Sequence, residues 1–210
     1  MQDEITKHGK KIYKKAMSKE HSFAEKVKDI LIEILIIVFA VTLSIWFHSW
    51  SENRHNENDA IGFLTDLKSD LNNDILNLRH SKKTVQNNIQ IINNKQDLVN
   101  TETVFTKISN GNFEGFKTSG KIGHISNSKL RLELLNYYGD TYFATRFYDD
   151  VSNNYLQTLK IENSESTPTQ KQINLQKTYI KEAQNNVIYY DKTIKETEDI
   201  IKLIDAQLAE

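Results

Sequence analysis

The chain has 210 residues, a formal net charge of −1, 26% charged side chains and no cysteine. This length leaves room for one moderate domain beside a membrane segment, and the near-neutral charge argues against a nucleic-acid-binding protein, which carries a strongly basic face. Without cysteine, the chain has no disulfides, thiolate nucleophiles or cysteine-ligated metal sites. A single Pro and seven Gly leave few helix breakers, which favours an all-α fold over an all-β one.

The most apolar stretch is residues 30–50, ILIEILIIVFAVTLSIWFHSW. As a helix its 21 residues rise about 30 Å, enough to cross the hydrocarbon core of a bilayer. A cleavable signal peptide is the competing interpretation, but the basic region and the apolar core are both too long for one, and no A-x-A site follows. The sequence therefore predicts an uncleaved signal anchor that forms a transmembrane helix.

Basic residues are distributed very unequally on the two sides of this segment. Residues 1–29 hold eight lysines, whereas the 20 residues after Trp50 hold only Arg54 and Lys68. The positive-inside rule then predicts an inner-membrane protein with a cytoplasmic arm (1–29), a transmembrane helix (30–50) and a periplasmic helical bundle (51–210). For the arm, an ordinary solvated basic flank is favoured over an amphipathic helix lying on an anionic leaflet.

Five residues of the apolar segment are candidate contact or anchor residues. Trp46 and Trp50 lie at its outer end, the usual position of interfacial anchors. Ala40 and Ser44 form a small-xxx-small pair that lets two helices approach closely. Glu33 lies about one turn inside the cytoplasmic end, where an interfacial carboxylate, free or near Lys26, is favoured over an intramembrane contact with a partner, and both over proton relay.

The segment after Trp50 has a seven-residue apolar repeat without a miss, Leu64, Leu71, Leu78, Val85, Ile92 and Val99. Its companion series is mixed, Ile61, Lys68, Ile75, Lys82, Ile89 and Gln96. The pattern predicts a coiled-coil-like helix over about 52–100. Because neither Pro nor Gly separates Trp50 from Ile61, this helix is expected to be continuous with the transmembrane helix, as one rod of about 70 residues.

Residues 101–126 hold four of the seven glycines and predict turns, since the glycine spacing matches no phosphate-binding loop. Short helical turns are expected over Val104–Ser109 and Asn112–Lys117. Three phenylalanines of this region are expected to close one end of the bundle: Phe105, Phe113 and Phe116.

A second helix is expected over 127–162, capped by Asn127 or Ser128 and kinked at Gly139. Its predicted buried face is Phe143, Phe147, Val151, Tyr155 and Leu159. Its tyrosines, Tyr137, Tyr138, Tyr142 and Tyr148, are expected to fill the core rather than to form an aromatic ligand cage.

After the loop 163–169, the last helix repeats two series every seven residues. The first is Ile173, Ile180, Val187, Ile194, Ile201 and Leu208, and the second is Gln176, Ala183, Tyr190, Thr197 and Ile204. The two heptad helices are expected to lie side by side, with 127–162 antiparallel to both. The predicted fold is therefore all-α, an up-down-up bundle with short helical turns at one end.

Short groups of residues in and around the apolar segment form a recognisable pattern: Lys19-Glu20-His21-Ser22-Phe23, Ile32-Glu33-Ile34 and Trp50-Ser51-Glu52-Asn53-Arg54. Further groups continue it: Leu64, Asp66-Leu67, Asp70-Leu71, Phe116, Ser119-Gly120-Lys121, Ser126-Asn127, Leu130-Arg131 and Tyr137-Tyr138. The chain thus resembles, over roughly 19–72 and 112–139, an uncharacterised family of short single-pass membrane proteins typical of Bacteroidetes-type gram-negative bacteria. The resemblance implies an inner-membrane protein with a periplasmic helical domain, and no activity. Ile32 stands where that family usually has Gly, and bulkier residues replace a second Gly near Val38–Ala40.

No constellation of catalytic, cofactor-binding or metal-ligating residues appears in the sequence. His48 and His55 are seven residues apart, about 10 Å along a helix, which is too far to share an ion. The expected function is that of a non-catalytic interaction protein, an accessory or scaffold subunit of an envelope complex. The reason is the mixed series from Ile61 to Gln96, which alternates apolar residues with Lys and Gln and is expected to be completed by a helix of another protein. The expected partners of this chain are the lipid bilayer and a protein partner or second copy. The alternative is a ligand-sensing bundle that signals to a membrane partner.

Overall fold

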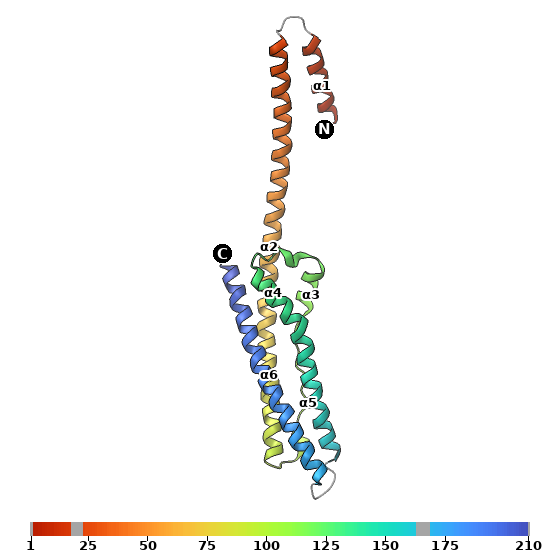
Figure 1. Cartoon of the computed structure of the whole chain (residues 1–210), viewed down its shortest axis with the longest axis vertical. Coiled ribbons are helices and arrows are strands. Elements are labelled where there is room, and N and C mark those ends of the chain that lie inside the picture. The colour runs from red at the N-terminus through yellow and green to blue at the C-terminus, as the bar shows by residue number, and fades with distance from the viewer. Residues whose placement is uncertain (1, 18–22, 163–168, 210) are drawn as a thin grey trace. The chain divides into compact units, whose positions relative to one another are not determined.

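The computed structural model of the chain (Figure 1) describes residues 2–17, 23–162 and 169–209, with side chains for 6–14, 27–162 and 169–209. The expectations for Lys26, for loop residues 163–168 and for residues 19–22 of the resemblance lie outside this description. The chain forms two compact units, Met1–His55 and Asn56–Glu210. Each unit is described by itself below.

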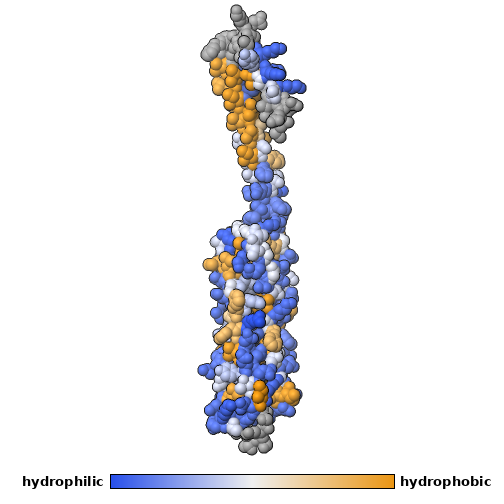
Figure 2. Space-filling view, turned by 90° about the vertical axis from the view of Figure 1, so that its right-hand side faces the viewer, coloured by the Kyte–Doolittle hydropathy of each residue, from blue (hydrophilic) through white to orange (hydrophobic). Residues whose placement is uncertain are grey.

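The first unit holds helix α1 (Gln2–Met17) and the beginning of α2 (Phe23–Asn93). The predicted continuity is confirmed, because α2 is one helix of 71 residues that contains both the apolar segment and the first bundle helix. Among the described residues, α2 is the one helix that by length and composition is able to cross a membrane, and none of its most apolar window is buried. Figure 2 shows this segment as a hydrophobic band followed by a hydrophilic stretch of the same helix.

Helix α2 ends at Asn93, a few residues before the predicted end near 100. Lys95 adopts a left-handed conformation (φ 53°), and the N–H groups of Lys95 and Gln96 donate to the carbonyls of Ile92 and Ile91, at 3.1 and 2.9 Å. This is a Schellman motif, which satisfies carbonyls at the helix end. Val99 therefore leaves the heptad seam and is 75% exposed, while its neighbour Leu98 is buried.

The second unit continues with short elements and then two long helices. Residues 98–100 form a 3-10 turn, η1, and residues 101–110 have no regular secondary structure and follow a largely extended path up to Asn110, whose backbone is helical. Then follow α3 (Gly111–Thr118), η2 (Lys121–His124), α4 (Ser128–Asn136), the π-helix η3 (Tyr137–Thr141), α5 (Tyr142–Glu162) and α6 (Gln170–Leu208). The described residues contain no strand, so the all-α class is confirmed.

The predicted caps and turns are partly confirmed. Asn127 caps α4, since its side chain accepts from Leu130 N–H at 3.1 Å. The turn predicted over Asn112–Lys117 lies within α3, which buries Phe113 and Phe116. The turn predicted over Val104–Ser109 is wrong, because that segment is extended and Phe105 is exposed.

Relative to α2, the middle helix and α6 both run in the opposite direction from the expectation, and the middle helix is antiparallel to α6 alone. Ion pairs join Lys68 to Asp205 and Lys82 to Asp191, so α6 is antiparallel to α2. The extended segment 101–110 carries the chain back along the bundle before α4 begins, so α4 and α5 run parallel to α2 (Figure 1). Sequence reasoning missed this because it treated 101–126 as a compact turn rather than as a full-length return.

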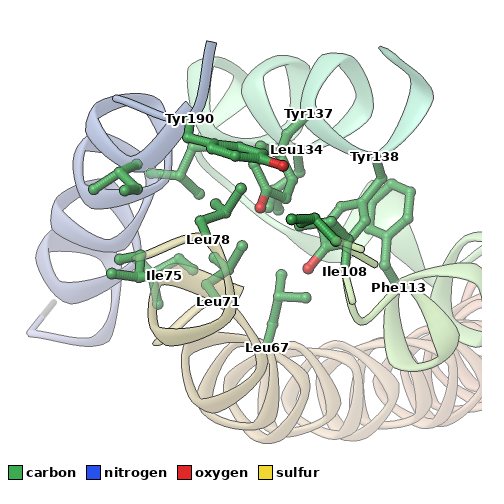
Figure 3. Packing of buried hydrophobic residues seen from close by; sticks show 14 of the residues in the cluster. Leu67, Leu71, Ile75, Leu78, Ile108, Phe113, Leu134, Tyr137, Tyr138 and Tyr190 are labelled. Atoms are coloured by element: carbon green, nitrogen blue, oxygen red, sulfur yellow. The ribbon is translucent and has the colours of Figure 1, made fainter. Parts of the chain in front are cut away.

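The core lies between α2, α6 and the α4–η3–α5 segment (Figure 3). Of the predicted seam, Leu64, Leu71, Leu78, Val85 and Ile92 are buried, as expected. On α6 the second series forms the centre of the seam, because Ala183, Tyr190, Thr197 and Ile204 have no exposed surface. Tyr137 and Tyr138 fill the core as predicted, with Tyr138 stacked on Phe113 at a centroid distance of 4.3 Å.

The predicted buried face of α5 is wrong at two positions. Phe143 and Phe147 are 70% and 65% exposed, and Leu159 is the buried member of that series. The face that α5 actually buries is mostly polar and contains Thr145, Asp149, Ser152 and Asn153. Asp149 and Asn153 are buried because they bind the extended segment, as described next. The Thr145 hydroxyl lies 3.4 Å from the Tyr189 hydroxyl on α6.

Candidate functional site

Residues 101–110, here called the strap, follow a largely extended path and lie between α2 and α5. An extended segment inside a helical bundle has no neighbouring strand, so its backbone N–H and C=O groups need other partners. Side chains from the helices supply them. The strap side chains Thr101, Val104 and Ile108 are buried.

Two buried asparagines bind the strap as a neighbouring strand would. Asn153 on α5 accepts from Val104 N–H at 2.8 Å and donates to the carbonyl oxygen of Val104 at 2.6 Å. Asn88 on α2 makes the same pair with Glu102, at 3.0 and 2.7 Å. Each primary amide thus satisfies both backbone groups of one residue, which fixes the strap from both sides.

Asp149 on α5 forms the first of two carboxylate clamps. Its Oδ2 accepts from Thr106 N–H at 2.6 Å, and its Oδ1 accepts a short hydrogen bond from the Tyr190 hydroxyl on α6. Burial raises the pKa of Asp149, against the lowering effect of these hydrogen bonds. Burial and the adjacent carboxylate also raise the pKa of Tyr190, so this phenol stays a donor.

Asp74 on α2 forms the second clamp and has no exposed surface. Its Oδ1 accepts from Ser109 N–H at 2.8 Å, and its Oδ2 accepts from the Tyr137 hydroxyl at 3.4 Å. Burial raises the pKa of Asp74 from 3.8 to about 6, although the bond from Ser109 opposes this shift. The two clamps together connect the strap to α2, η3, α5 and α6.

The residues that hold the strap on α2 follow a heptad of their own, Asp74, Ser81 and Asn88. Ser81 accepts from the Thr106 hydroxyl at 2.8 Å, so the three positions meet Ser109, Thr106 and Glu102 in turn. Fourteen helical residues rise about 21 Å, and seven extended residues rise about 23 Å. This match of rise keeps the strap in register with one face of α2.

The π-helix η3 places Tyr137 and Tyr138 in the core. π-Helices are rare and occur mostly as single-turn bulges, often at functional sites. Here the wider turn contains Gly139, the predicted kink, and delivers Tyr137 to the Asp74 clamp.

The outer side of the strap and of α5 carries exposed aromatic rings. We call Phe105, Phe143 and Phe147 the aromatic surface, with exposed fractions of 78%, 70% and 65%. Between the strap and α5 lies a cavity of about 450 Å³, whose lining includes Phe105, Tyr142 and Arg146. Phe143 and Phe147 are four residues apart on α5 and so lie on the same side of this helix, and exposed apolar side chains that lie together are typical of binding surfaces.

The mixed seam that suggested a partner helix is covered by the chain itself. Lys68 and Lys82 lie 2.5 and 2.6 Å from the carboxylates of Asp205 and Asp191 on α6, and Arg79 lies 2.9 Å from Glu198. Ile75 is buried under the same helix. The central part of this series, from Lys68 to Lys82, is therefore an internal contact of the bundle and is not open to a partner helix, whereas Ile61 and Gln96 at its ends are exposed.

The five residues singled out in the apolar segment do not converge on one site. Trp46 and Trp50 each contact Phe47 edge to face at 5.8 Å, and Arg54 lies 4.8 Å from the Trp50 ring centre. Ala40 and Ser44 are exposed on α2. Glu33 Oε1 lies 3.4 Å from His8 Nδ1 on α1, a contact that the sequence did not suggest.

Metal-ion chemistry finds no support in the described part of the chain, where no group of three or more His, Asp or Glu side chains is placed to hold an ion. The residues that sequence reasoning missed are Asp74, Asn88, Asp149 and Asn153. The sequence does contain a pattern that could have identified Asp74 and Asn88 on α2, since polar residues recur every seven positions beside the apolar seam, at 74, 81 and 88. Asp149 and Asn153 on α5 are four residues apart, so these two do not form such a seven-residue repeat.

The comparisons with known proteins identify a family without an assigned activity. A model of a family of unknown function, DUF6090, matches residues 33–188, most of the chain. No curated protein and no solved structure matches. The chain belongs to the DUF6090 family, as the resemblance to an uncharacterised family led us to expect.

Proposed function

We propose that this member of the DUF6090 family is a non-catalytic, membrane-anchored helical interaction protein, an accessory or scaffold subunit of an inner-membrane or envelope complex. The observation that carries the proposal is the aromatic surface, because Phe105, Phe143 and Phe147 are exposed although the bundle around them is well packed. Aromatic side chains, phenylalanine included, are enriched in the cores of protein–protein interfaces.

The proposed location rests on α2 and on the distribution of lysine. Residues 30–50 span the inner membrane, the basic arm is cytoplasmic and the bundle is periplasmic, because eight lysines precede the apolar segment and few basic residues follow it closely. Trp46 and Trp50 anchor the outer end of the span, and Arg54 stacks on Trp50 beyond it.

A non-catalytic role agrees with the state of the buried carboxylates. Buried acids with a raised pKa are the usual candidates for acid–base groups. In Asp74 and Asp149, however, both carboxylate oxygens accept hydrogen bonds from the strap and from a tyrosine. These acids have a structural task, holding the strap.

The test is crosslinking in native membranes followed by mass analysis of the products. The wild-type chain should give a discrete product of higher mass, and the double variant Phe143→Ser/Phe147→Ser should lose most of it while keeping its Tm. Ile188→Ser is the matched control, because Ile188 is 67% exposed but lies on α6. A chain that stays monomeric and partnerless, or a double variant that crosslinks normally, would contradict the proposal.

The second candidate is a ligand-sensing bundle that signals to a membrane partner. The cavity beside the strap favours it, since it combines the aromatic rings of Phe105 and Tyr142 with the guanidinium of Arg146. A compound from a metabolite panel should then raise the Tm of the full chain, and Arg146→Ala should remove that shift. If no compound raises the Tm, this candidate fails and the interaction role is unaffected.

A further inference from the structure

Four lysines of helix α1 lie on one face. Lys7, Lys10, Lys11 and Lys14 are spaced three and four residues apart, which places them side by side on a helix, and all four are exposed. Gly9, Ile12 and Tyr13 lie away from this stripe, with the large Tyr13 ring exposed. The sequence alone favoured a plain basic flank, and the regular helix over Gln2–Met17 changes that balance.

We infer that α1 binds anionic phospholipid headgroups on the leaflet where α2 enters the membrane. The charges of the helix and the lipid are complementary, because a stripe of lysines opposite apolar residues is the pattern of helices that lie in the interface of an anionic membrane. Only a few residues separate α1 from α2 along the chain, so the lysine stripe stays close to the headgroups. This inference rests on the proposed membrane insertion of α2, and it is independent of any protein partner.

Lysine chemistry limits how deep α1 lies. The lysine stems extend toward the headgroups, while the ammonium groups stay out of the hydrocarbon. The competing position is against α2, where His8 Nδ1 lies 3.4 Å from Glu33 Oε1. That pair is a weak tie, since His8 is mostly exposed. The four lysines act together, and each contributes about fivefold to membrane association, the equivalent of ~1 kcal/mol per basic residue.

The chain offers a clean site for a probe, because it contains no cysteine. A Cβ added at Gly9 meets no atom within 4 Å, so Gly9→Cys can carry an environment-sensitive fluorophore in the full chain. Gly62→Cys is the matched control, because Gly62 is equally open but lies on the bundle part of α2. Both proteins are placed in vesicles of phosphatidylcholine alone and of phosphatidylcholine with phosphatidylglycerol.

The Gly9 probe should shift to shorter wavelength and resist an aqueous quencher only in the vesicles with phosphatidylglycerol, and added salt should weaken the effect. Replacing the four lysines by Gln should abolish the shift, and replacing them by Arg should preserve it. The Gly62 probe should respond to neither lipid.

Several outcomes would overturn the inference. A Gly9 signal that is identical in both lipids, or that persists in the Gln variant, contradicts lipid binding. If that persistent signal is lost in His8→Ala, α1 is docked on α2 instead. A chain that does not float with the vesicles would instead refute the membrane insertion proposed for α2.

Discussion

Asp74 is a carboxylate without exposed surface whose pKa is raised to about 6 by burial. Because the pKa is higher in the folded chain than the unperturbed 3.8, the folded state binds the proton more tightly than the unfolded state. The contribution of this group to stability is therefore fully present below about pH 4, and it is lost as the pH rises through about 6. Asp149 contributes to the pH dependence of stability in the same direction, since burial raises its pKa too.

We therefore expect the Tm of the full chain in detergent to rise when the pH is lowered from about 7.5 to about 5. The full shift of about two pKa units corresponds to about 2–3 kcal/mol for Asp74, of which about half develops between pH 7.5 and pH 5. Asp74→Asn keeps an acceptor for Ser109 N–H but cannot titrate, so it should flatten this dependence. Thermal unfolding of both proteins at the two pH values measures it, and an unchanged slope in Asp74→Asn would refute the assignment.

The strap is the element on which the bundle depends most, because it crosses the interior of the second unit without a neighbouring strand. Asn153 alone satisfies two of its backbone groups, the N–H and the C=O of Val104. A buried polar group that loses its partner costs about 1–3 kcal/mol.

Asn153→Ala should therefore lower the free energy of unfolding by about 2–4 kcal/mol and accelerate hydrogen exchange at Val104. Asn154→Ala is the matched control, because Asn154 is the exposed neighbour on the same helix and should change stability by less than about 0.5 kcal/mol. Thermal unfolding with amide exchange by mass spectrometry measures both. Equal effects of the two substitutions would show that the amide does not hold the strap.

Elements with a strong period could be predicted from the sequence, and the strap could not. The seven-residue repeats predicted which side chains of α2 and α6 are buried, and Asn127 predicted where α4 begins. Both features can be read from residues that are close together in the sequence. Val104–Ser109 was predicted as a helical turn, since local preference carries no information about Asn88 or Asn153, which lie far away in the sequence. The aromatic surface was missed for the same reason, because the strap and not the phenylalanines occupies the buried side of α5.

At the scale of the whole second unit, the ion pairs give a direct test of helix direction. Lys68, Lys82 and Lys121 lie within 2.6 Å of carboxylates of Asp205, Asp191 and Asp59, respectively. A zero-length carbodiimide crosslinker should therefore join these three pairs in the full chain, as read by mass spectrometry of the linked peptides. Crosslinks of Lys68 to Asp191 and of Lys82 to Asp205 would indicate the opposite direction of α6.

The orientation proposed for the whole chain is testable with the two glycine positions. In intact cells, a membrane-impermeant maleimide should label Gly62→Cys and should reach Gly9→Cys only after the inner membrane is opened. The difference follows from the lysine-rich arm, which the positive-inside rule places in the cytoplasm. Labelling of Gly9→Cys alone in intact cells would reverse the proposed topology.

The strap also determines the order in which the second unit can assemble during synthesis. When α2 and the strap have emerged, Asn88 and Asp74 are available, but the partners of Val104 and Thr106 on α5 have not been made. In a newly made chain the strap is therefore bound by α2 alone until α5 has been synthesised, and α6 completes the bundle last. Contacts between segments so far apart in sequence slow folding, so the bundle should complete itself late, with the strap open to chaperones or to a binding partner until then.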